Sequence, residues 1–320
     1  MTAAMRVFSG RANLPLARRV CEYLGMGLGA VKYTQHPDGE LLVKLEEDVR
    51  GRDVFIIQPT STPVHDHLME LLIFIDCARR ASAQRVTAVV PYYGYARQDR
   101  KDEGRVPITA KLTANMITTA GADRVLTIDL HAAQVQGFFD IPVDNLTAEP
   151  VLSRHYSRMK LENLVLVSPD VGSTKRARVY AQRLGGDLAI IDKRRVSGSE
   201  TAVGRIIGNV KDATVLMIDD MITTGGTVSG AAQLCMEQGA KRVLVGASHA
   251  VLCGPAPERL AEAPIEEVVV TDTIDIPEAI KQRLGKLKVL SVAELVGEAI
   301  HRIHNDESVS SLFTIENGRG

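Results

Sequence analysis

Short apolar runs rich in β-branched residues alternate along the chain with longer stretches whose apolar positions follow helical periodicity. The apolar runs predict buried strands, and the periodic stretches predict amphipathic helices between them. The expected strands cover residues 54–58, 85–91, 124–129, 164–168, 188–192, 215–219, 242–248 and 267–271. The expected helices cover residues 67–81, 109–120, 173–184 and 226–238. This alternation favours α/β domains, each with a mainly parallel sheet flanked by helices.

The length of the chain indicates how many such domains it forms. A chain of 320 residues favours about two domains. Pro150 follows a polar stretch and marks the expected junction between them. We therefore expect an N-terminal domain over residues 1–148, a C-terminal domain over residues 149–300 and a frayed tail at residues 314–320.

Two adjacent carboxylates, Asp219 and Asp220, stand where the strand predicted over residues 215–219 is expected to end. The hydroxyl- and glycine-rich turn that follows opens a predicted helix and consists of Thr223, Thr224, Gly225, Gly226 and Thr227. Such a turn exposes backbone N–H groups, and the helix dipole favours phosphate. The carboxylates would repel a bare phosphate, so they predict a sugar phosphate whose hydroxyl groups they bind, with a metal nearby. The run resembles the phosphoribose-binding signature of the phosphoribosyltransferase superfamily.

The same strand–loop–helix–strand pattern occurs earlier in the chain. Residues 53–62 and 84–90 flank a predicted helix in the way that residues 213–220 and 241–247 flank another. The first copy lacks both carboxylates and the Gly-Gly turn. The pattern favours a duplication in which only the second half kept the phosphate-binding turn.

Composition narrows the class of protein. With 45% hydrophobic and 24% charged residues, a net charge of −1 and a pI near 6.7, the chain gives no reason to expect a nucleic-acid or membrane partner. The N-terminal residues lack a basic segment followed by an apolar core, so we expect no signal peptide, and no apolar stretch is long enough to span a bilayer. The four cysteines form no C-x-x-C pair, so we expect free thiols in a reducing cytoplasm.

Polar side chains also follow other predicted strands. Arg97 and Gln98 lie in the tyrosine-rich segment 91–101, which is either a solvated loop or a nucleotide site in which Arg97 reaches phosphates. His131 and Asp170 each follow a strand. A strand-end histidine is usually satisfied locally, but with a carboxylate it suits a Mg²⁺ ion carried largely by substrate phosphates.

The basic triplet that contains Lys193 and Arg195 follows the strand at residues 188–192 and precedes a Gly/Ser-rich stretch. A basic triplet is usually a solvated face. The carboxyl end of a strand in an open α/β sheet is also the usual place for a ligand. A loop that carries these cations would close over a reacting phosphate and stabilise the transition state.

Together these segments resemble the ribose-phosphate diphosphokinases, which synthesise phosphoribosyl diphosphate (PRPP). The resemblance runs from about Arg6 to Phe313 and rests on an ordered set of motifs. They begin at Asp38, Tyr92, Pro107, Asp129, Gln136, Ser168, Asp192 and Ser308.

The resemblance implies two tandem phosphoribosyltransferase-like domains, assembled as a homohexamer, with segment 301–313 packing back on the first domain. It implies that Asp38, Gly39 and Glu40 of a neighbouring subunit bind the adenine of ATP and that Arg97 and Gln98 bind its phosphates. It also implies Mg²⁺ at His131 and Asp170.

For ribose 5-phosphate, the resemblance implies that Asp219 and Asp220 hold the ribose hydroxyls and that the 223–227 turn holds the phosphate, with Arg195 nearby. The β,γ-diphosphoryl group of ATP would pass to the 1-hydroxyl of the sugar, giving PRPP and AMP for nucleotide biosynthesis. Lys193 and Arg195 would stabilise the charge that develops on the transferring group.

The chain departs from the family pattern at several positions. Thr223 replaces a common Asp, and the stretch after Arg195 lacks the usual proline- and arginine-containing continuation. The residues that match a regulatory phosphate/ADP site are Arg50, Arg105, Ser308 and Ser310. Asp48 and Gly104 replace serines near that site, so we expect weak activation by phosphate and weak allosteric control by ADP.

Two other functions stay open at the level of sequence. A nucleobase phosphoribosyltransferase would share the acidic pair and the turn, but it needs only one such domain. A non-catalytic regulatory homologue of the synthetases would fit the replacement at Thr223. Retention of His131, Asp170, Lys193 and Arg195 argues against that second alternative.

Overall fold

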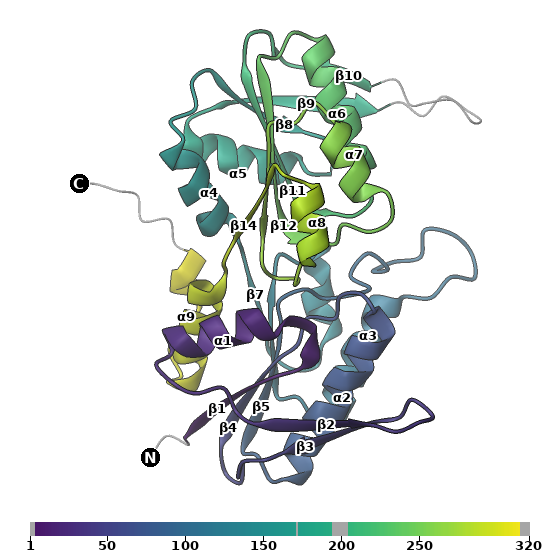
Figure 1. Cartoon of the computed structure of the whole chain (residues 1–320), viewed down its shortest axis with the longest axis vertical. Helices are drawn as coiled ribbons and strands as arrows, with labels where there is room; N and C mark the ends of the chain where they lie inside the picture. Colours follow the sequence, from purple (N-terminus) through teal and green to yellow (C-terminus); the bar gives the residue numbers. More distant parts are fainter. Residues whose placement is uncertain (1–3, 171, 194–203, 314–320) are drawn as a thin grey trace. The chain divides into compact units, whose positions relative to one another are not determined.

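A computed structural model describes residues 4–170, 172–193 and 204–313 (Figure 1). The chain divides into two compact units. The first contains the residues up to Ala148, Thr273–Asp275 and the chain from Ser291 onward, whereas the second contains Glu149–Asp272 and Ile276–Leu290. Each unit is an α/β structure around a mainly parallel sheet, so the α/β fold class predicted from the sequence is confirmed.

The sheet of the first unit has five parallel strands in the order β1-β4-β5-β6-β7. Their bounds are β1 Met5–Ser9, β4 Asp53–Ile57, β5 Arg85–Val90, β6 Arg124–Ile128 and β7 Val143–Leu146. The helices of this unit are η1 Arg11–Asn13, α1 Leu14–Tyr23, α2 Val64–Arg80, α3 Thr109–Ala120, η2 Ala133–Phe138, α9 Ala293–His304 and η3 Ser310–Phe313. An antiparallel hairpin, β2 Val31–Gln35 and β3 Leu41–Leu45, lies beside α2.

The second unit has a sheet in the order β10-β9-β8-β11-β12-β13-β14. Only the pair β9–β10 is antiparallel among the described strands of this sheet. The strands are β8 Leu164–Ser168, β9 Asp187–Lys193, β10 Gly204–Ile207, β11 Thr214–Ile222, β12 Arg242–Ala250, β13 Glu267–Thr271 and β14 Leu287–Leu290. The helices are α4 Glu149–Arg158, α5 Thr174–Leu184, α6 Gly226–Glu237, α7 Ala256–Glu262 and α8 Glu278–Arg283.

The central strands form because their apolar runs are buried on both faces, as a parallel sheet covered by helices requires. Every residue of β4 and of β8 is buried. In the first unit, Phe8 of β1 meets Phe74 of α2 with ring centroids 5.9 Å apart. Helices α3 and α5 end at Gly121 and Gly185, whose φ angles of 111° and 74° supply the left-handed turn that ends a helix.

Strand β11 is longer than its sequence pattern predicts. It continues to Ile222 because β12 continues to Ala250, and the two strands pair at Met221–His249 and Ile222–Ala250. The expectation that the strand ends at Asp219 is therefore wrong. The acidic pair, whose residue type usually interrupts strands, lies inside the strand near its carboxyl end.

The C-terminal part of the chain returns to the first unit, where α9 packs against α1 (Figure 1). The Tyr23 hydroxyl donates to Glu298 at 2.8 Å. Buried Asp53 accepts hydrogen bonds from Arg85 at 2.9 and 2.6 Å, and Nδ1 of His304 lies 2.8 Å from the same carboxylate. A buried carboxylate needs such partners, so these contacts tie α9 to β4.

None of the helices in the described part of the chain combines the length and the apolar character that crossing a lipid bilayer requires.

Candidate functional site

The carboxyl ends of β9, β8 and β11 meet along one edge of the second sheet, because these strands are parallel neighbours. In open α/β sheets ligands bind at this edge. The acidic pair lies on β11, Asp170 follows β8, and Lys193 ends β9. The topology therefore gathers four residues predicted as site residues along one edge of the second unit.

The two carboxylates of the acidic pair share one cation. The Nη1 atom of Arg176, on α5, lies 3.0 Å from Oδ1 of Asp219 and 3.1 Å from Oδ1 of Asp220. The same Oδ1 of Asp219 accepts hydrogen bonds from the Ser173 hydroxyl at 3.3 Å and from the Asp220 backbone N–H at 2.9 Å. Three donors therefore fix one oxygen of Asp219.

This environment changes the ionisation of the acidic pair. Burial, followed by the charge of neighbouring Asp220, raises the pKa of Asp219 to about 7, and Arg176 opposes the rise. Two carboxylates side by side in a poorly solvated place resist losing both protons. Hydroxyl donors or a further cation supplied by a ligand would stabilise the form in which both carboxylates are ionised.

The turn after β11, residues 223–227, has the geometry of an anion cradle. Gly225 has a φ of 74°, and the first helical hydrogen bond of α6 runs from the Ser229 amide to the Gly225 carbonyl at 2.9 Å. The amides of residues 226–228 therefore have no acceptor within the helix. Thr224, Gly226 and Thr227 are exposed, so an anion can reach this end of α6.

Helix α7 supports the cradle from its other side. The Cys253 amide donates to the Thr223 carbonyl at 3.0 Å, and Arg259 donates to the Thr224 carbonyl at 3.4 Å. A Cβ atom on Gly225 would lie 3.3 Å from Cγ of Leu260, and one on Gly226 would lie 3.4 Å from Nη1 of Arg259. At Gly225 the contact is tight and the positive φ disfavours any larger residue, whereas at Gly226 an added Cβ would make only an ordinary contact.

Asp170 lies half-buried in the loop between β8 and α5, and its Oδ1 accepts the Ser173 amide at 2.9 Å. Lys193 ends β9, where its backbone pairs with Gly204. The other predicted catalytic cation, Arg195, lies outside the described residues.

In the first unit, the corresponding edge carries the predicted nucleotide residues. Arg97 and Gln98 are exposed in the loop after β5, and the Thr109 hydroxyl at the start of α3 donates to Oε1 of Gln98 at 2.5 Å. Gly94 sits so close to the loop after β4 that a Cβ atom would lie 2.5 Å from the Thr60 carbonyl. The loop is thus built tightly against the strand ends, with Arg97 facing solvent.

His131 follows β6, the strand next to β5 in the first sheet, and it is exposed. Asp129, two residues earlier, has a φ of 40°, and its carboxylate accepts the Ala148 amide at 2.9 Å. Gln134, from η2, hydrogen-bonds to Asp99 in the loop after β5. The structure therefore brings the segment of His131 and the segment of Arg97 and Gln98 together at one sheet edge.

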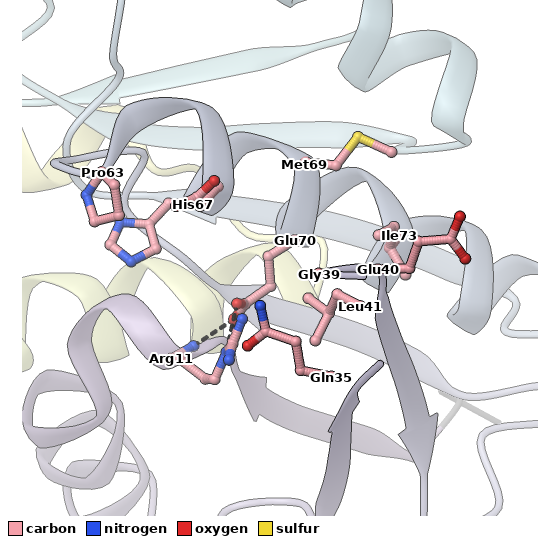
Figure 2. Close-up of a pocket in the computed structure, with 11 residues that line it drawn as sticks. Arg11, Gln35, Gly39, Glu40, Leu41, Pro63, His67, Met69, Glu70 and Ile73 are labelled. Atoms are coloured by element: carbon pink, nitrogen blue, oxygen red, sulfur yellow. Dashed lines mark hydrogen bonds and ion pairs between the residues drawn. The ribbon is translucent and has the colours of Figure 1, made fainter. Parts of the chain in front are cut away.

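Gly39 and Glu40 lie elsewhere in the first unit, at the tip of the β2–β3 hairpin (Figure 2). They line a pocket of about 700 Å³ together with Arg11, Gln35, Leu41, Pro63, Asp66, His67, Met69, Glu70 and Ile73. Asp38 accepts the Glu40 amide at 3.1 Å and so shapes the tip. Arg97, Gln98 and His131 do not line this pocket, so the predicted ATP-binding residues fall in two separate places.

The hairpin is anchored by an ion pair between the exposed Arg11 and the buried Glu70. Glu70, with a side chain 1% exposed, accepts Nε of Arg11 at 2.7 Å and the Arg11 amide at 2.6 Å. The Arg11 guanidinium lies 5.4 Å from the ring centroid of Tyr33 on β2, close enough for a cation–π contact. Figure 2 shows the Arg11–Glu70 pair on the wall of the pocket.

The residues predicted for regulation lie at separate points of the first unit. Arg50 donates to the Ser82 hydroxyl at 3.2 Å, and its amide donates to Asp48 at 3.1 Å. Arg105 is exposed, and the Ser310 amide donates to the Ser308 hydroxyl at 3.3 Å. Within the described residues, the two serines contact each other, and no hydrogen bond joins them to either arginine.

Sequence reasoning missed Arg176 and Ser173 as site residues. Both lie in the predicted helix at residues 173–184, where an arginine resembles any solvated helix residue. Their contact with Asp219 spans more than 40 residues of sequence. A usable signal was the position of Ser173, at the start of a helix that follows a strand next to β11.

Comparisons with known proteins agree with this geometry. A family model for the N-terminal domain of ribose phosphate pyrophosphokinase matches residues 5–121, and one for the phosphoribosyl synthetase-associated domain matches residues 197–314. The chain is 58% identical over 312 residues to a ribose-phosphate pyrophosphokinase of Rhodopirellula baltica, covering 97% of this chain and 98% of that one. Identity to the Nostoc enzyme of the same name is 54% over 310 residues, covering 97% and 93%.

A solved structure gives the same result. The crystal structure of phosphoribosylpyrophosphate synthetase from Mycobacterium smegmatis aligns with a TM-score of 0.88 at 43% identity, covering 95% of this chain and 99% of that chain. The two units are thus tandem phosphoribosyltransferase-like domains, as the resemblance predicts. The chain belongs to the ribose-phosphate pyrophosphokinase family and is an enzyme of that kind, so the predicted family and enzyme class are confirmed.

Proposed function

We propose that this chain transfers the β,γ-diphosphoryl group of ATP to the 1-hydroxyl of ribose 5-phosphate, producing PRPP and AMP for nucleotide biosynthesis. The observation that carries the proposal is the acidic pair, Asp219 and Asp220, which only residues 221–225 separate from the open N-terminus of α6. A sugar phosphate matches both features, because its hydroxyls donate to carboxylates while its phosphate accepts from the helix amides.

In this proposal the 5-phosphate binds the turn Thr223–Thr227 and the ribose hydroxyls bind the acidic pair. Thr223 contributes a hydroxyl where many relatives carry a carboxylate. Its hydroxyl donates to phosphate without adding repulsion, so ribose 5-phosphate binds with an altered affinity. The site holds the sugar with its 1-hydroxyl free to react.

ATP binds the first-unit sheet edge, where Arg97 and Gln98 contact its phosphates. Asp38, Gly39 and Glu40 contact the adenine of an ATP held by a neighbouring copy of the chain. The location of Gly39 and Glu40 in a pocket that excludes Arg97 and Gln98 supports this division. The working protein is therefore a homo-oligomer, for which we propose a hexamer.

The reaction is an in-line displacement at the β-phosphorus of ATP. The 1-hydroxyl oxygen forms a bond to that phosphorus, the bond to the oxygen shared with the α-phosphate breaks, and AMP leaves while the hydroxyl proton passes to water. Such chemistry depends mainly on positioning and charge neutralisation. Lys193 and Arg195 stabilise the charge on the diphosphoryl group as it moves.

We propose His131, in the first unit, and Asp170, in the second, as the Mg²⁺-binding residues. Within the described residues, no three His, Cys, Asp or Glu side chains are grouped to hold a metal. Mg²⁺ keeps several waters and is held largely by substrate phosphates, so it needs few protein ligands. When bound, the ion neutralises phosphate charge, while Ser173 keeps one oxygen of Asp170 oriented.

We also propose a regulatory site and a cellular location. Arg50, Arg105, Ser308 and Ser310 are the proposed phosphate/ADP site, and Asp48 beside Arg50 makes an anion there less favourable. All four cysteines are free thiols, which suits a cytoplasmic enzyme.

The test is to supply purified protein with ATP, ribose 5-phosphate and Mg²⁺ and to quantify the products. We expect AMP and PRPP in equal amounts, with neither formed when the sugar is omitted. Release of ADP, or product only when PRPP and a nucleobase are supplied, would contradict the proposal. No turnover in any oligomeric state would favour the regulatory homologue instead.

A further inference from the structure

One guanidinium nitrogen reaches both carboxylates of the sugar site. Successive side chains of a strand usually point to opposite faces of the sheet. Nevertheless Nη1 of Arg176 lies 3.0 Å from Asp219 and 3.1 Å from Asp220. To reach both carboxylates, the guanidinium must be held close to β11 by the helix that carries Arg176.

Helix α5 provides that support. Ala177 and Tyr180 of this helix are buried against the sheet, while the Arg176 side chain is 27% exposed. A site side chain is positioned best when a rigid element carries it. The guanidinium is always charged and its donors have fixed directions, so it suits the task of holding two carboxylates.

These contacts leave one oxygen of Asp219, Oδ2, for a ligand. Oδ1 of Asp219 accepts from Arg176, from the Ser173 hydroxyl and from the Asp220 amide. The donors that contact Asp219 in the described part of the chain all meet Oδ1, so none of them occupies Oδ2, and the side chain of Asp220 lies within hydrogen-bonding reach of the same carboxylate. With Oδ1 fixed, the direction of Oδ2 is fixed as well.

We propose that Arg176 is a positioning residue of the sugar site, which holds Oδ1 of both carboxylates and presents Oδ2 of Asp219 to a ribose hydroxyl. This inference rests on the proposed binding of ribose 5-phosphate. Arg176 acts through the acidic pair and does not touch the reacting atoms. Its positive charge also offsets the repulsion between the two carboxylates. Without that charge, the repulsion favours a protonated Asp219.

The experiment measures the dissociation constants of ribose 5-phosphate and ATP by calorimetry with the full chain. It compares the wild type with Arg176→Met, Arg176→Lys, Asp219→Asn and the double variant Arg176→Met/Asp219→Asn. Arg178→Met is the matched control, because Arg178 is exposed on the same helix. Thermal unfolding verifies that each variant is folded, and Arg176→Lys provides the result if the Met variant does not fold.

We expect Arg176→Met to weaken ribose 5-phosphate binding by about 10- to 100-fold, the range for losing charge-assisted hydrogen bonds. ATP binding and the Arg178→Met control should match the wild type. Arg176→Lys should bind the sugar more tightly than Arg176→Met, because lysine keeps the positive charge but lacks the fixed donor directions of the guanidinium. The double variant should bind the sugar about as weakly as Asp219→Asn alone, since Arg176 acts through that carboxylate.

Two results would overturn the inference, and they have different meanings. If Asp219→Asn weakens sugar binding but Arg176→Met does not, or if the two effects multiply in the double variant, Arg176 does not position Asp219 and the sugar site stands. If Asp219→Asn binds ribose 5-phosphate like the wild type, the proposed sugar site itself is wrong and the role of Arg176 falls with it.

Discussion

The two units share the order of their central strands but differ at the point where the middle strand meets its helix. In the first unit β4 lies between β1 and β5, and in the second β11 lies between β8 and β12. The repeated sequence pattern aligns residues 54–58 with 215–219. Gln58 and Asp219 are therefore counterparts.

Both counterparts are held by the segment that follows the first strand of their unit. Oε1 of Gln58 accepts the Ala12 amide at 3.1 Å, and its Nε2 donates to the His67 carbonyl at 3.3 Å. Gln58 is fully buried, so both ends of its amide are occupied by the backbone. In the described residues the donors to Asp219 all contact its Oδ1, so its Oδ2 has no donor.

The same position of a shared fold thus has a structural role at Gln58 and a ligand-binding role at Asp219. A neutral amide whose donor and acceptor are both satisfied inside the protein has only a structural role. The pKa of the Asp219 carboxylate is raised, and its Oδ1 is held by three donors, so its Oδ2 is available to a ligand. The fold supplies the position, and the side chain decides its use.

The largest effect should separate a lysine of the second unit from one of the first. Lys193→Ala in β9 should lower kcat by about 10²- to 10³-fold, the usual loss when a donor that stabilises transition-state charge is removed. Steady-state rates of AMP release measure it. Lys44→Ala is the control, because Lys44 is exposed on β3 and pairs with Glu46; its rate should equal that of the wild type. Unchanged turnover in Lys193→Ala would remove Lys193 from the mechanism.

The second prediction concerns pH. Because burial and Asp220 raise the pKa of Asp219 to about 7 from 3.8, the native state binds this proton more tightly than the unfolded state does. The resulting stabilisation is fully present below pH 3.8 and is lost as pH rises through about 7. Relative to Asp219→Asn, the wild-type free energy of unfolding should fall by about 2 kcal/mol between roughly pH 5.5 and 8.

Urea unfolding at a series of pH values measures this difference. Asp187→Asn serves as the control, because Asp187 is exposed at the start of β9, and it should follow the wild-type curve. Parallel curves for wild type and Asp219→Asn would mean that Asp219 ionises normally.

The third prediction tests the counterpart in the first unit. Gln58→Leu leaves the half-buried Ala12 amide without its acceptor, so it should cost about 1–2 kcal/mol of unfolding free energy. Ribose 5-phosphate affinity should not change, in contrast to Asp219→Asn. Calorimetry and urea unfolding of the same samples measure both quantities. A loss of sugar affinity in Gln58→Leu would place the first unit in the sugar site.

The smallest effect concerns how the two helices begin. Helix α2 starts after Pro63, whereas α6 starts after Gly225 with a φ of 74°. Gly225→Ala should lower the free energy of unfolding by about 1 kcal/mol, because an L-residue is strained at positive φ.

Gly230→Ala, inside α6 with no atom near the added Cβ, is the control for Gly225→Ala and should stabilise by about 0.5 kcal/mol. If both substitutions change the free energy of unfolding equally, an alanine at Gly225 does not strain the turn.

The sequence predicts the parts of this molecule that depend on local pattern. The strands at residues 164–168 and 267–271 coincide with β8 and β13, because buried parallel strands are short continuous apolar runs. The hairpin strands β2 and β3 are half-exposed and carry polar residues, so their pattern is weak. The end of β11 was misplaced because its length is set by pairing with β12.

The candidate site follows the same division. The acidic pair and the turn from Thr223 to Thr227 are contiguous in sequence, so their chemistry is visible before folding. Arg176 comes from another element, and its role depends on a contact that only the folded unit creates. The pocket between the hairpin and α2 likewise joins distant segments, and the sequence indicated Gly39 and Glu40 only through resemblance.

A crystal structure of the full chain with ribose 5-phosphate tests the difference between the two units most directly. The account predicts the 5-phosphate on the amides at the start of α6 and the ribose hydroxyls on Asp219 and Asp220, with the loop after β4 empty. Sugar bound beside Gln58, or an acidic pair that contacts no ligand in a saturated crystal, would contradict it.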